Sequence, residues 1–111
     1  MELTSPSKDL AQRILNEVGF EDRLTGYRLR ERTGVMTIQL YSFEEVVWLL
    51  NDPHPSLDFT RLEQWIRETM GDPELAGRIG DVIQEDISDQ VRTLRIRDLM
   101  ALRLYQCLES T

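Results

Sequence analysis

The apolar residues of this 111-residue chain change their spacing twice along the sequence, and this limits the possible folds more than any other feature. Between residues 26 and 40, apolar and polar side chains alternate, which is typical of β-strands. Before and after this segment, apolar residues recur every three or four positions, as on one face of an amphipathic helix. Thr33-Gly34 supplies a turn within the alternating segment. The sequence therefore predicts a β-hairpin of about 26–31 and 35–40 in a mainly helical α+β fold.

Capping signals divide the rest of the sequence into four or five helices. Ser42 and Glu45 have the spacing of a capping box, and Asp72-Pro73 places an N-cap residue before a proline at the first helical position. The predicted helices span about 8–18, about 43–50, from Asp58 to Gly71, from Asp72 to a loop at 85–89, and about 94–109. We expect one domain of residues 1–111 with residues 1–6 disordered, and we keep a third strand at 91–96 as an alternative.

Charge and composition narrow the classes of partner. The chain has 20 acidic and 13 basic residues, and residues 35–91 hold twelve of the acidic residues against three basic ones. Such an acidic block repels phosphate, so a protein partner is favoured over a nucleic-acid partner. No apolar run approaches the ~20 residues of a membrane span, and the start of the chain does not read as a secretory signal. A single cysteine is typical of a reducing compartment, and we expect a cytoplasmic protein that needs no metal or cofactor.

The order of motifs after the hairpin resembles a known family. Ser42-Phe-Glu-Glu-Val follows the hairpin, Asp58-Phe comes later, and the most specific stretch is Trp65-Ile-Arg-Glu-Thr-Met-Gly-Asp-Pro-Glu-Leu-Ala76. This order resembles that of a family of small uncharacterised bacterial and archaeal domains, over roughly residues 26–80. The family pattern is an aromatic hairpin, a helix with leucine and glutamate, a helix with Asp-Phe and Trp-Ile or Trp-Val, and then Gly-Asp and Leu-Ala. The resemblance implies a fold and supplies no catalytic residue.

The residues that most often carry chemistry are isolated in this sequence. His54 stands between two prolines, where an imidazole titrates near neutral pH, but spacing assigns it no carboxylate, cysteine or serine partner. Cys107 lies in an apolar helical segment, where a small buried residue is the common role for cysteine. The acidic pairs are explained by solvated helix faces. We therefore predict no catalytic residue and no enzyme, and we keep His54 as a speculative site.

Two surfaces are candidates for binding. Arg28, Arg30 and Arg32 fall on one face of the first hairpin strand, where they fit either a charge-guarded edge or a phosphate-bearing or acidic ligand. The second half of the last helix, residues 99–108, is apolar on nearly every side, which is typical of a helix that is central in the fold or shared with another chain. Candidate interaction residues are Arg28, Arg30, Arg32, Trp48, Leu49, Leu102 and Tyr105. The sequence favours a non-enzymatic protein-interaction module that self-associates through its last helix, with nucleic-acid or phosphate-ligand binding by the arginines as the alternative.

Overall fold

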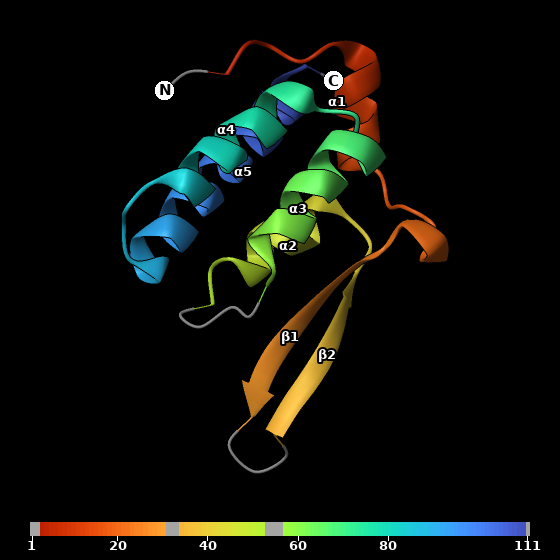
Figure 1. Ribbon diagram of the computed structural model, residues 1–111. Coiled ribbons are helices and arrows are strands. Elements are labelled where there is room, and N and C mark those ends of the chain that lie inside the picture. Colours follow the sequence, from red (N-terminus) through yellow and green to blue (C-terminus); the bar gives the residue numbers. More distant parts are fainter. Residues whose placement is uncertain (1–2, 31–33, 53–56, 111) are drawn as a thin grey trace.

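The computed structural model describes residues 3–30, 34–52 and 57–110, except for the side chains of 28–30 and 34–35. The elements within these residues are α1 (Lys8–Leu15), η1 (Phe20–Asp22), β1 (Leu24–Arg30), β2 (Gly34–Leu40), α2 (Phe43–Leu49), α3 (Phe59–Gln64), η2 (Trp65–Thr69), α4 (Pro73–Gln84) and α5 (Asp89–Glu109). The helices form a bundle in which α4 and α5 lie side by side, α2 and α3 lie next to them, and α1 covers one end (Figure 1). The mainly helical α+β fold predicted from the sequence is confirmed.

The hairpin projects from the helices and is anchored at its base (Figure 1). β1 and β2 are antiparallel, and Leu24 pairs with Leu40 at the end of the hairpin that lies in the core. Gly26 is buried next to them, and a Cβ on it would lie 3.0 Å from Leu49 Cδ2. A Cβ there would require the Leu49 side chain to shift by a few tenths of an ångström, so this glycine allows close packing of the hairpin on α2. The predicted strands match the observed ones to within a few residues.

The predicted capping residues hold the helix starts. Ser42 Oγ accepts a hydrogen bond from Glu45 N at 3.1 Å, and Glu45 in turn accepts from Tyr41 N at 2.8 Å. Asp58 Oδ1 accepts from Thr60 N and Asp72 Oδ1 from Leu75 N. The bonds from Glu45 N, Thr60 N and Leu75 N satisfy amides that each helix itself leaves without a partner.

The predicted end of the last helix is correct, but its predicted start and the alternative third strand before it are wrong. The helix begins at Asp89, five residues before the predicted start, because Ser88 Oγ accepts from Val91 N and caps it. The alternative third strand at 91–96 is therefore incorrect, since these residues are helical. The alternation of apolar and charged residues there arises from two different faces of one helix.

The first helix and the start of the chain also differ from expectation. α1 ends at Leu15 because the chain becomes extended at Asn16, and Val18 N then donates to Tyr41 O at the end of β2. Residues 1–6 were expected to be disordered, but of these Leu3 is buried and Thr4 hydrogen bonds to Glu74. Among the helices in the described part of the chain, none combines the length and apolar character needed to cross a membrane.

Candidate interaction surface

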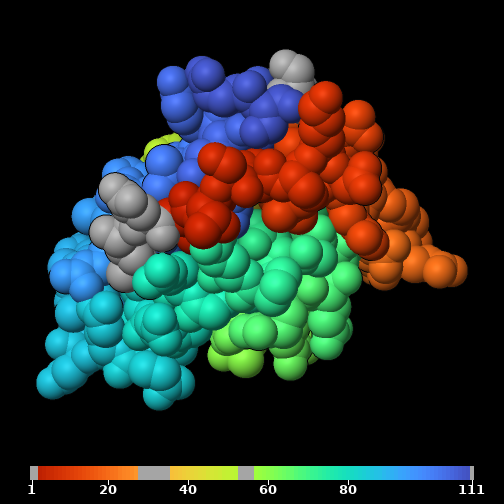
Figure 2. Space-filling view, turned by 90° about the horizontal axis from the view of Figure 1, so that it is seen from above, coloured from red at the N-terminus to blue at the C-terminus, as the bar shows by residue number. Residues whose placement is uncertain are grey.

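The longest helix described, α5, has two apolar faces, of which one is buried and the other is exposed. Its inner face packs against α1, α2 and α4, and the residues buried on it are Ile96, Leu99, Met100, Arg103 and Cys107. Its other face carries large apolar side chains that stay exposed. In Figure 2 the C-terminal part of α5 lies beside α1 at one edge of the molecule. Residues 99–108 are thus apolar on nearly every side because one face builds the core and the other meets solvent.

The exposed face follows a regular spacing. We name it the α5 outer face, and its residues are Val91, Leu94, Asp98, Ala101, Leu102, Tyr105 and Leu108. Apart from Leu102, these residues are separated alternately by three and four positions, the spacing of the contact positions in a coiled coil. Leu94 is 47%, Tyr105 61% and Leu108 58% exposed. Asp98 is the one charged residue in this series.

A hollow lies on each side of the α5 outer face. One, of about 300 Å³, is lined by Val82, Arg95, Asp98, Leu99 and Leu102, between α4 and α5. The other, of about 240 Å³, is lined by Leu50, Asn51, Asp52, Gln90, Thr93, Leu94 and Arg97, beside the end of α2. Leu94, Asp98 and Leu102 belong both to the outer face and to the lining of a hollow. The surface is therefore a ridge with a recess along each flank, a shape into which side chains of another helix fit.

A buried arginine holds α5 in place. Arg103 is 1% exposed, and its Nε lies 2.9 Å from Asp72 Oδ2 at the start of α4. Its Nη2 donates to Glu74 Oε1 at 2.7 Å and its Nη1 to Thr4 O at 2.7 Å. A buried guanidinium needs such partners because its desolvation is otherwise costly. The ion pairs fix the rotation of α5 about its axis and so fix which residues form the outer face.

Glu74 links the same cluster to the start of the chain. Thr4 donates to it through both its hydroxyl, at 2.8 Å, and its backbone amide, at 3.1 Å. The hydrogen bond from the Thr4 hydroxyl, joined by those from Arg103 and the Thr4 amide, holds the pKa of Glu74 below its usual value. Gln106 adds a bond from its Nε2 to Leu3 O at 2.8 Å. Leu3 and Thr4, near the start of the chain, are therefore hydrogen bonded to residues of α4 and α5.

The arginines at the start of α5 are all engaged within the molecule. Arg92 donates to Glu85 O and Ile87 O and pairs with Asp89. Arg95 pairs with Glu85, and Arg97 with Asp98 at 3.0 Å. These contacts tie the three arginine side chains to the loop before α5 and to its first turns.

Cys107 does not have the setting of a reactive thiol. It is fully buried on the inner face of α5, and burial raises the pKa of the thiol. The thiolate is the nucleophilic form, so a raised pKa makes the group less reactive. Tyr105, on the outer face, hydrogen bonds to Glu109, and this bond raises the pKa of its phenol.

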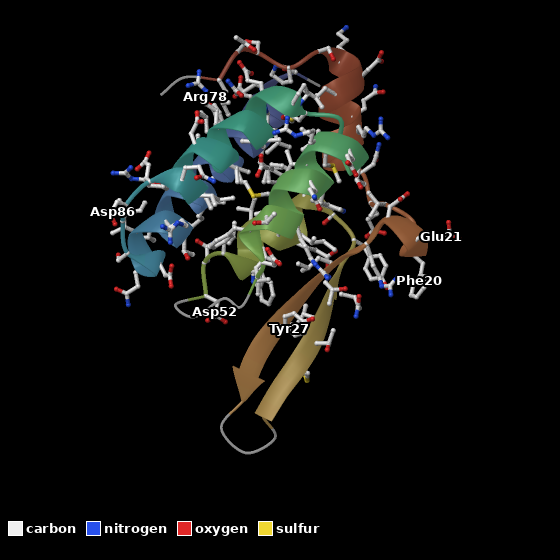
Figure 3. The ribbon with its side chains drawn as sticks, viewed as in Figure 1. Phe20, Glu21, Tyr27, Asp52, Arg78 and Asp86 are labelled. Carbon is white, nitrogen blue, oxygen red and sulfur yellow. The ribbon has the colours of Figure 1, made fainter. Side chains whose placement is uncertain are left out.

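The other residues expected to bind are distributed over the molecule. Trp48 is 59% exposed on α2, but Leu49 is 1% exposed and packs on Gly26, so it belongs to the core and not to a surface patch. Arg28 and Arg30 fall in β1, with side chains outside those described, and Arg32 and His54 lie outside the described residues. Figure 3 places Phe20 and Tyr27 toward the hairpin, apart from α5.

Sequence reasoning missed most of the outer face and the arginine cluster. It named Leu102 and Tyr105 but not Val91, Leu94 or Leu108. The alternating three- and four-residue spacing was the signal that identifies them. Arg103 carried a signal as well, because it shares the spacing of Ile96, Met100 and Cys107 on the buried face.

In the part of the chain that the structure describes, no three His, Cys, Asp or Glu side chains are grouped so that they could hold a metal ion. Comparison with family models, with curated proteins and with solved structures finds no match to this chain. The resemblance to small uncharacterised domains stays a prediction.

Proposed function

We propose that this protein is a non-enzymatic protein-interaction module that binds an amphipathic helix on the α5 outer face. One observation carries the proposal: five large apolar side chains of one helix face stay exposed, and four of them, Val91, Leu94, Tyr105 and Leu108, follow coiled-coil spacing. Exposed apolar surface of this kind typically marks a contact site. A helix with apolar residues at matching spacing is the partner that such a face accepts.

The anchoring of α5 supports this role. A binding helix must present its side chains in a fixed geometry, because flexibility in the free state lowers affinity. Arg103 is held by Asp72, Glu74 and Thr4 at distances of 2.7 to 2.9 Å, so α5 is fixed before any partner arrives. The proposal includes a reducing, cytoplasmic location, which the single buried thiol of Cys107 supports.

The test uses a synthetic helical peptide of about three heptads, with leucine at both contact positions of each heptad and with glutamate and lysine elsewhere. Titrated into dilute ¹⁵N-labelled protein, it should shift amide resonances of α5 residues 91–108. Leu94→Glu should weaken this binding about tenfold or more, because it places a charge within the apolar contact.

Met36→Glu is the matched control. Met36 lies on β2 and is 40% exposed, close to the 47% of Leu94, so the two variants change charge and apolar area alike. The control should bind the peptide as the unaltered protein does. Shifts confined to the hairpin, or equal losses in the two variants, would contradict the proposal. Circular dichroism of both variants checks that the fold is kept.

A further inference from the structure

We infer that the helix received by the α5 outer face is α5 of a second copy of this chain, running antiparallel. The inference rests on the proposed function and adds the partner and its orientation. Its basis is the internal symmetry of the face: six of its residues are arranged symmetrically about the point between Leu99 and Met100. A two-fold axis at this point brings every one of the six opposite another member of the set, as an isologous interface requires.

The side chains are complementary in this register. Val91 meets Leu108 of the second copy, and Leu94 meets Tyr105. Asp98 meets Ala101, the smallest side chain of the face, which leaves space for the carboxylate. In each pair a smaller residue faces a larger one, which is the condition for dense packing between facing helix positions.

Charge selects the antiparallel orientation. In a parallel pair at matched register, Asp98 would face Asp98 of the second copy, and like charges in direct contact destabilise an interface. In the antiparallel pair the two carboxylates lie on opposite sides of the axis. Each is 3.0 Å from its own Arg97, which offsets its charge. A polar residue at a contact position commonly restricts how a helix pair can align, and opposed helix dipoles add to the preference for the antiparallel pair.

The size of the face sets the expected strength. From Val91 to Leu108 the helix rises about 26 Å, and its contact face is about 10 Å wide. An interface built on these two helices lies at or below the lower end of specific interfaces, which bury about 1,200 Å² in total. We therefore expect a dimer with a dissociation constant on the order of micromolar, in exchange with monomer.

Charge-pair variants test both the partner and the orientation. Light scattering coupled to size-exclusion chromatography, over a range of loading concentrations, should show the unaltered protein passing from monomer to dimer. Leu94→Lys and Tyr105→Glu should each weaken dimerisation about tenfold or more. Both positions are solvent-exposed, so each variant should keep the circular dichroism spectrum of the parent.

Mixing the variants separates the orientations. In the antiparallel pair Leu94→Lys faces Tyr105→Glu, so an equimolar mixture should recover association to within about tenfold of the parent. A mixture of Leu94→Lys and Leu94→Glu should not recover it. Recovery in the second mixture and not in the first would overturn the antiparallel arrangement.

The outcome also separates this inference from the proposed function. A chain that stays monomeric at every concentration, while the synthetic peptide still binds to α5, would exclude the second copy as partner and leave the proposed function standing. A chain that neither dimerises nor binds the peptide would overturn both.

Discussion

At the scale of single residues, Arg103 is the most consequential side chain in the molecule. It is the largest fully buried side chain described, and its partners come from α4, from the start of the chain and from its own helix, through Gln106. Asp72 makes two stabilising contacts: it caps α4 by accepting a hydrogen bond from Leu75 N, and it forms an ion pair with Arg103. Removing one member of such a cluster leaves a charge in the core without compensation.

Replacing Arg103 by methionine should lower the free energy of unfolding by about 3–5 kcal/mol, because Asp72 is then a buried charge without its cation. Arg67→Met is the control. Arg67 pairs with Glu63 at 3.0 Å on the surface, and its loss should cost about 0.5 kcal/mol or less. Urea denaturation followed by circular dichroism gives both values.

The double variant Asp72→Asn with Arg103→Met keeps the test decisive even where Arg103→Met unfolds. Asparagine still caps α4 but carries no charge, so the double variant should be more stable than Arg103→Met alone. Equal losses for the buried and the surface arginine would contradict the role assigned to this cluster.

At the scale of elements, the junction between η2 and α4 contains some features that the sequence predicts and one that it does not. Gly71 was predicted as a helix end and Asp72 as an N-cap, and both are confirmed. The π-helical turn η2 was not predicted, because its i→i+5 bonds leave the apolar spacing of the sequence nearly unchanged. The Trp65–Ala76 motif thus builds a structural junction, in which Trp65 Nε1 also donates to Asp22 O at 2.7 Å.

Two glycines near this junction should respond to alanine in opposite directions. Gly71 has φ 72°, a conformation that disfavours a Cβ, so Gly71→Ala should lower stability by about 1–2 kcal/mol. Gly77 lies within α4, and a Cβ there meets nothing within 4 Å. Gly77→Ala should raise stability by up to about 1 kcal/mol, since alanine favours the helix. Thermal unfolding of both variants measures this, and a shift of the same sign in both would contradict it.

At the scale of the whole molecule, the contacts that sequence reasoning could not find are those between distant segments. The strands, the caps and most helix starts follow from neighbouring residues, and the sequence predicts them. The bonds from Arg103 to Thr4 O and from Gln106 to Leu3 O join the two ends of the chain. Spacing along one segment says nothing about which segment lies against it, so the first residues were expected to be disordered. The outer face of α5 was missed for another reason: two apolar stripes on one helix obscure each other's period.

The joining of the chain ends should make stability depend on pH through Glu74. The pKa of Glu74 in the folded protein lies below its ordinary value of 4.5, chiefly because of the hydrogen bond from the Thr4 hydroxyl. A group with a lowered folded pKa contributes its stability in full above the unfolded value and loses it as the pH falls through the folded value. We therefore expect Glu74→Gln to be less stable than the unaltered protein at pH 7 and the difference to shrink below pH 4.5. Chemical denaturation at pH 7, 5, 4 and 3 measures both stabilities.

The control is Glu44→Gln, which makes the same change at an exposed position of α2. If its stability difference followed the same pH course, the acid sensitivity would come from net charge and not from the contact between Glu74 and Thr4.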